Sequence, residues 1–128
     1  MSGPVLSVKG LARWAVVGDV TNSLKPAFRV CERIEGTGAT VYRVSPYGKH
    51  EGVFTKLSEI PSDTKIDAVN LVVSPSVGVI ALEEMKQRDI KYCFIQPGAD
   101  GGDVLTTAAK LGITVQRGCV LMQDMQKV

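Results

Sequence analysis

The sequence predicts an α/β protein with a Rossmann-like three-layer sandwich, in which helices cover both faces of a five-stranded parallel sheet. Three observations support this fold class. Short apolar runs alternate along the chain with segments whose apolar residues recur at helical spacing. The first run, residues 14–17, is continuous rather than alternating in polarity, which is typical of a parallel strand buried on both faces. Turns rich in glycine and proline separate the segments.

The first predicted strand is residues 14–17, and the polar turn 18–25 follows it. Asn22 and Ser23 are expected to start a helix, and Pro26 suits its first turn because no N–H is needed there. The glycine that opens the turn is expected to allow a sharp bend. Free N–H groups at the helix start favour an anion above the strand, so this is interpreted as a phosphate-binding turn. A connection without a ligand is the alternative, because neither common glycine-rich phosphate motif occurs.

The first helix is expected to stop at the glycines of residues 35–38 and to bury Ala27, Val30, Cys31 and Ile34. Residues 39–44 form the second predicted strand, and proline and glycine exclude regular structure from residues 45–49. Few apolar residues occur in residues 51–65. This segment is expected to be an irregular crossover, with one helical turn at residues 57–61.

The third predicted strand is residues 66–73, after which Ser74 caps a helix that has Pro75 at its first position. The apolar stripe of this helix is expected to consist of Val77, Ile80, Ala81 and Met85. The fourth predicted strand is residues 92–95, and the fifth is residues 113–115. Between them, Asp100 or Asp103 is expected to cap a helix that carries Val104, Leu105, Ala108 and Leu111.

The five strands most economically take the order 3-2-1-4-5 with right-handed crossovers, which places a switch point between the first and fourth strands. Ligands of such sheets bind beyond the carboxyl ends of the strands at the switch point. Four loops should reach this edge, and each contains small or polar residues with proline or glycine: 18–25, 45–49, 74–76 and 96–99.

The length of 128 residues predicts one domain, residues 1–128, with residues 1–12 as an N-terminal extension. The three cysteines are far apart and form no C-x-x-C pair, so reduced cytosolic thiols are expected rather than disulfides or a zinc site. A net charge of +2, dispersed along the chain, argues against nucleic acid as a partner.

The sequence predicts a cytoplasmic protein with no membrane partner, because no apolar stretch approaches the roughly 20 residues that cross a bilayer. The first dozen residues also lack the long apolar core of a secretory signal. A mitochondrial presequence is the alternative, because residues 1–13 contain no acidic residue.

The end of the second strand indicates which nucleotide would bind. A site for NAD normally has an acidic residue there, which accepts hydrogen bonds from the ribose hydroxyls. Residues 43–49 contain no acid and carry Arg43 and Lys49 instead. A ribose with an additional phosphate is therefore favoured, as in NADP or coenzyme A (CoA).

The sequence resembles the small stand-alone CoA-binding proteins, whose fold is also that of the CoA-binding domain of the succinyl-CoA synthetase α subunit. The resemblance covers about residues 14–122. It rests on an ordered series of short motifs: Ala15-Val16-Val17-Gly18, Lys25-Pro26, Val44-Ser45-Pro46, Leu57-Ser58-Glu59-Ile60-Pro61, residues 67–75, Gln96-Pro97-Gly98-Ala99 and Gly118-Cys119-Val120-Leu121.

The resemblance implies that the turn after the first strand holds the pyrophosphate and adenosine of CoA. Residues after the second strand would lie near the adenine and its phosphorylated ribose, and residues after the fourth strand would face the pantetheine arm. Asp19 and Val20 depart from the family, which usually has small residues there. The expected cofactor-binding residues are Gly18, Asp19, Val20, Thr21, Asn22, Ser23, Lys25, Ser45, Pro46, Lys49, Ser74, Pro75, Gln96, Pro97 and Gly98.

No acid–base pair, activated nucleophile or metal site is evident in the sequence. His50 is interpreted as an exposed loop residue, and Cys119 as a buried cysteine, with a mixed disulfide to the CoA thiol as the alternative. We therefore expect non-catalytic binding of CoA or an acyl-CoA, and no enzyme activity. The alternatives are a component of a CoA-dependent ligase or an NADP-linked reductase. The sequence leaves the oligomeric state open.

Overall fold

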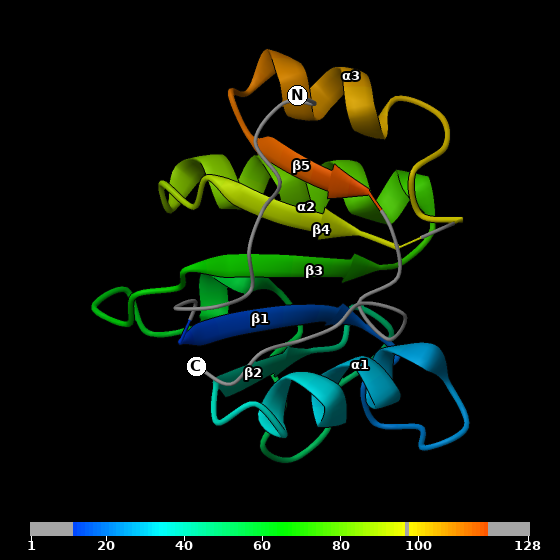
Figure 1. Cartoon of the computed structure of the whole chain (residues 1–128), viewed down its shortest axis with the longest axis vertical. Helices are drawn as coiled ribbons and strands as arrows, with labels where there is room; N and C mark the ends of the chain where they lie inside the picture. The colour runs from blue at the N-terminus through cyan, green and yellow to red at the C-terminus, as the bar shows by residue number, and fades with distance from the viewer. Residues whose placement is uncertain (1–11, 97, 118–128) are drawn as a thin grey trace.

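Five parallel strands form one sheet within residues 12–96 and 98–117, which the computed structural model describes (Figure 1). The expected motif at residues 118–121, Pro97 and residues 1–11 lie outside the described residues. The elements are β1 (Arg13–Gly18), α1 (Pro26–Glu35), β2 (Thr40–Val44), the 3-10 helix η1 (Leu57–Glu59), β3 (Ala68–Val72), α2 (Pro75–Gln87), β4 (Tyr92–Ile95), α3 (Val104–Lys110) and β5 (Thr114–Arg117).

The sheet has the strand order β2-β1-β3-β4-β5, and every neighbouring pair is parallel. Strands that alternate with helices in this way confirm the predicted α/β, Rossmann-like fold class. The helical turn expected at residues 57–61 is also present, as η1.

The position of the third strand differs from the expected order, because β3 lies between β1 and β4 rather than outside β2. The place outside β2 is taken by Phe54, which forms a single parallel bridge with Val44. If the bridge at Phe54 is counted as a third strand outside β2, the strands β3 and β4 become the fourth and fifth. The order is then 3-2-1-4-5, and β5 is one further strand beyond β4. A strand buried on both faces belongs at the centre of a sheet, and residues 51–65 are too polar for a longer edge strand.

Helices cover both faces of the sheet. Trp14 and Val16 of β1 pack in one apolar cluster with residues of α1, whereas Ala15 and Val17 pack in a second cluster with residues of α2 and α3. Successive strand residues point to opposite faces, so α1 lies on one side and α2 and α3 lie on the other. Figure 1 shows α1 beside β1 and β2, and α3 beside β5.

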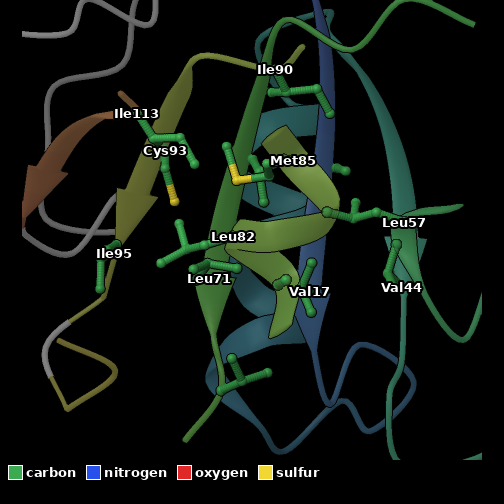
Figure 2. Packing of buried hydrophobic residues seen from close by; sticks show 14 of the residues in the cluster. Val17, Val44, Leu57, Leu71, Leu82, Met85, Ile90, Cys93, Ile95 and Ile113 are labelled. Atoms are coloured by element: carbon green, nitrogen blue, oxygen red, sulfur yellow. The ribbon is translucent and has the colours of Figure 1, made fainter. Parts of the chain in front are cut away.

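The second cluster is built around α2, as Figure 2 shows. This helix buries Gly78, Ala81, Leu82 and Met85. The expected stripe was therefore wrong at Ile80, which is 60% exposed, and it missed Leu82. The reason is that Gly78 faces inward and brings the helix close to Val104 and Leu71. The expected stripe was based on large apolar residues, and a glycine does not contribute to that pattern.

Candidate functional site

Two cavities meet at the carboxyl ends of β1 and β3, where the chain's crossovers diverge to opposite sides and where Gly18 lies opposite Val72. The first, here called the α1 cavity, has a volume of about 360 Å³ and is lined by Asp19, Lys25, Pro26, Ala27, Tyr47 and Val72. The second, here called the β4 cavity, has a volume of about 250 Å³ and is lined by Tyr47, Val72, Val73, Ser74, Gln96, Gly98 and Ala99. The site therefore lies at the switch point, where ligands of such sheets bind.

The start of α1 forms one wall of the α1 cavity. The helix begins at Pro26 with Lys25 in the N-cap position, so the expected start at Asn22 or Ser23 was wrong. Asn22 instead closes a turn before the helix, because its Oδ1 accepts a hydrogen bond from the Leu24 N–H at 3.0 Å. Its carbonyl also accepts from the Lys25 N–H at 2.9 Å. Asparagine is common both in such turns and at helix starts, and here it forms the turn.

Gly18 is required for packing rather than for a sharp bend. Its φ is not positive, unlike that of several other glycines. A Cβ at this position would lie 2.6 Å from the Val72 carbonyl oxygen and 2.9 Å from the Cβ of Ala27. The absent side chain thus lets α1 approach the ends of β1 and β3 closely, which brings the helix N-terminus to the floor of the cavity.

Arg43 anchors the turn between β1 and α1 instead of facing a ribose phosphate. Its Nη1 donates to the Val20 carbonyl at 3.1 Å, and its Nη2 pairs with Glu35 Oε1 at 2.9 Å. Its guanidinium also lies over the Phe28 ring, 4.9 Å from the centroid, which is a favourable cation–π distance. The basic group that the sequence suggested for phosphate recognition is therefore used within the protein.

Lys49 lines a third cavity of about 360 Å³, together with His50, Glu51, Val53, Thr55 and Glu59. The pKa of Glu59 is lowered, mainly because the Thr55 N–H and hydroxyl donate hydrogen bonds to its carboxylate, and less because of the Lys49 and Lys56 charges. Lys49 and Lys25 therefore line different cavities. His50 is exposed, as expected.

The β4 cavity is bounded by the loop after β4. Gln96 is only 4% exposed and donates from Nε2 to Asn70 Oδ1 at 3.2 Å. Asp100 accepts from the Gly98 N–H at 3.3 Å and pairs with Arg117 at 2.6 Å. The hydrogen bond from Arg117 is the main reason why the pKa of Asp100 is lowered. This contact ties the loop to the end of β5, so Asp100 does not cap α3, where Asp103 takes the N-cap position.

The structure brings five of the expected residues to the two cavities, and these are Asp19, Lys25, Ser74, Gln96 and Gly98. The remaining described ones line neither cavity. Val20 and Ser45 are buried, Thr21 and Ser23 are exposed, and Pro46 is half-buried. Pro75 begins α2 and lies against the glycines at 101 and 102.

Sequence reasoning missed Tyr47, which lines both cavities and is 56% exposed. The available signal was an aromatic residue inside a loop expected to reach the ligand edge. It also missed Asn70, which is fully buried and holds Gln96. A polar residue in the middle of a continuous apolar run was the signal for that position.

The walls of the two cavities suit different chemical groups. The Lys25 ammonium and the first turn of α1 are the kind of donors that bind phosphate, and they fit the anionic part of a nucleotide cofactor. Asp19 opposes them with a negative charge. The described residues that line the β4 cavity include no charged side chain, so this cavity fits a neutral chain.

Metal or thiolate chemistry has no support in the described part of the chain. No group of three or more His, Cys, Asp or Glu residues is placed there to hold a metal ion. Cys31 and Cys93 are buried, and burial raises the pKa of both thiols, that of Cys31 to about 12. Cys119 lies outside the described residues. Nor does any helix between residues 12 and 117, Pro97 aside, have the length and apolar character to cross a membrane.

Comparison with known proteins gives a family and several similar structures. Residues 12–125 match the family described as CoA binding domain. A conserved hypothetical protein from Pyrococcus furiosus is 27% identical, with a TM-score of 0.73 over 87% of this chain and 97% of that one. A hypothetical protein from Pyrococcus horikoshii OT3 is 22% identical, with a TM-score of 0.77 over 90% of this chain and 82% of that one.

A larger protein contains a similar fold. Acetyl-coenzyme A synthetase 1 of Ca. Korarchaeum cryptofilum is 18% identical, with a TM-score of 0.64 over 81% of this chain and 25% of that one. No curated protein matches the sequence significantly.

Proposed function

This chain belongs to the CoA binding domain family, and on that premise we propose that it binds coenzyme A or an acyl-CoA without catalysing a reaction on it. The observation that carries the proposal is the pair of adjoining cavities at the switch point, one with a cation and a helix N-terminus and the other neutral. CoA has the same division, because an anionic nucleotide is joined to an uncharged pantetheine chain.

Lys25 and the first turn of α1 would hold the diphosphate in the α1 cavity. Ser74, Gln96 and Gly98 would lie along the pantetheine in the β4 cavity. Gly18 would act indirectly, by allowing α1 to approach the strand ends. CoA supplies a thiol for acyl transfer when it is bound, and the residues named here only bind and orient it.

Binding without chemistry is proposed because the cavity walls offer little for catalysis. Asp19 and Lys25 are the charged side chains among the residues lining the two cavities, and they are of opposite sign. Neither adjoins a cysteine, serine or histidine in the α1 cavity lining, so no activated nucleophile is formed there.

A role as a component of a CoA-dependent ligase is the second candidate. The observation that favours it is the similar fold within the Korarchaeum acetyl-coenzyme A synthetase, a quarter of which is covered by this chain. In that case this chain would supply the CoA site and another chain or domain would supply the reacting groups.

Titration calorimetry with CoA, dephospho-CoA, NADP and NAD tests the proposal. We expect CoA to bind more tightly than either dinucleotide, because only CoA has a neutral chain to fill the β4 cavity. Tighter binding of NADP would instead support a reductase and would overturn the proposal. Equal affinity for CoA and dephospho-CoA would argue against the sequence-based expectation that Lys49 contacts the ribose phosphate, since Lys49 lines a separate cavity together with Glu59.

A further inference from the structure

Tyr47 occupies a position that no other side chain of its loop shares. It lines both the α1 cavity and the β4 cavity, and among the described residues the only other one that lines both is Val72, at the end of β3. The other lining residues differ, since Lys25 lines the α1 cavity and Ser74 and Gln96 line the β4 cavity. The two cavities therefore share part of their walls, at Tyr47 and Val72.

The Tyr47 ring is available to a ligand. Tyr47 is 56% exposed, and its side chain makes no hydrogen bond or ring contact with the described part of the chain. An exposed aromatic side chain at the mouth of a site is unusual in a packing role, because it stabilises little where it stands. Tyrosine loses little conformational entropy on binding and offers a large apolar surface, which makes it a frequent contact residue.

We propose that Tyr47 and Val72 contact the ligand segment next to the diphosphate. Tyr47 would thereby favour nucleotides that carry a chain over nucleotides that end at the phosphates. This inference rests on the proposed function. A ligand that fills both cavities would contact Tyr47 and Val72, because these residues line each of them. In CoA the segment next to the diphosphate carries two methyl groups, which suit contact with an aromatic ring and a valine.

The charge of the site supports this division of roles. Lys25 is the only cation among the described residues that line the α1 cavity, and Asp19 in the same cavity opposes it. Electrostatic attraction for the phosphates is therefore weakened, and contacts with the neutral chain must carry a larger share of the selectivity. Tyr47 is placed to supply such contacts, because it lines the β4 cavity as well as the α1 cavity.

The test compares Tyr47→Ala and Tyr47→Phe with the wild-type protein by titration calorimetry, using CoA and 3′-phosphoadenosine 5′-diphosphate. The second ligand has the same nucleotide and phosphates without the pantetheine chain. We expect Tyr47→Ala to lose about tenfold or more in CoA affinity and less than about twofold for the truncated ligand. Tyr47→Phe keeps the ring and should stay within about twofold of wild type for both.

Tyr92→Ala is the matched control, because Tyr92 is also exposed but begins β4 at the opposite edge of the sheet. It should leave both affinities unchanged. An equal loss for both ligands in Tyr47→Ala, or no loss for CoA, would overturn the inference while leaving the proposed function in place. Failure of the wild-type protein to bind CoA would overturn both.

Discussion

The guanidinium of Arg43 on β2 donates to the carbonyl oxygen of Val20, 3.1 Å away and 23 residues earlier in the chain. Val20 is fully buried, so its carbonyl depends on a partner from the protein. The same guanidinium pairs with Glu35 and lies over Phe28, at the two ends of α1. One side chain therefore fixes the turn that leads from β1 to α1 and, with it, the position of Lys25.

Replacement of Arg43 by glutamine should loosen this turn. The Val20 carbonyl loses its charged donor, so we expect the free energy of unfolding to fall by about 1–3 kcal/mol, together with weaker CoA binding. Denaturant unfolding and titration calorimetry measure the two effects. Glu35→Gln is the control, because it removes the half-exposed ion pair but leaves the bond to Val20, and it should cost less than about 1 kcal/mol with unchanged affinity. Equal effects of the two substitutions would contradict the anchoring role.

Gly18→Ala should be poorly tolerated. The added methyl group would lie 2.6 Å from the Val72 carbonyl oxygen, which is backbone and cannot move aside alone. We expect a loss of about 1–3 kcal/mol in the free energy of unfolding, as for other overpacked sites. Gly78→Ala is the matched control, since its nearest neighbour would be a Val104 methyl group at 3.5 Å. The higher helix propensity of alanine should make that variant about 0.5–1 kcal/mol more stable. A stable Gly18→Ala protein would show that α1 has room to shift.

The elements could be predicted from the sequence because their signals are local. Strand 92–95 follows directly from its apolar run, and the start of α2 follows from Ser74 and Pro75. The place of β3 in the sheet could not be derived in this way, because a single bridge at Phe54 leaves no strand pattern in the sequence. Strand order depends on pairing between distant segments, and the shortest pairing here is too short to recognise.

The residues of the candidate site at the start of α1 could be predicted from the sequence, whereas those in the loop after β2 could not. Lys25 was expected because Lys25-Pro26 is one of the motifs of the family resemblance, although the helix start itself was placed too early in the sequence. Tyr47 and Lys49 are two residues apart in one irregular loop, yet they line different cavities. No periodicity determines which side chain of such a loop points toward the sheet. Arg43 has the right charge for a phosphate, and only the packed structure shows that Glu35 already neutralises it.

Lys25 and Asp19 line the α1 cavity with opposite charges, so their substitutions should act in opposite directions. Lys25→Ala should weaken CoA binding by about 1–3 kcal/mol, the range for loss of a charge-assisted hydrogen bond. Asp19→Asn should strengthen it, because a carboxylate beside the phosphates is removed. Calorimetry at low and high salt measures both changes, and both should shrink as salt screens the charges. Lys91→Ala is the control, because Lys91 lies at the amino end of β4, and it should leave the CoA affinity unchanged at either salt concentration. An unaltered dissociation constant for CoA in folded Lys25→Ala would refute the role of Lys25.

The buried thiols of Cys31 and Cys93 should be inert in the folded protein. Burial raises the pKa of both, that of Cys31 from 9.0 to about 12, so neither forms the reactive thiolate at pH 8. In a Cys119→Ser variant, which removes the one cysteine outside the described residues, a chromogenic disulfide reagent should label neither thiol until denaturant is added.

The same shift predicts how stability depends on pH. The unfolded chain loses its thiol protons near pH 9, whereas the folded protein keeps them until higher pH. The stabilising effect of keeping these thiols neutral is therefore complete below pH 9 and is lost as the pH rises through 9 toward 12. Cys31→Ala should make the alkaline decrease in the free energy of unfolding shallower than in the parent protein. Rapid labelling of Cys31 in the native protein at pH 8 would show that α1 opens readily, and would contradict the packing described above.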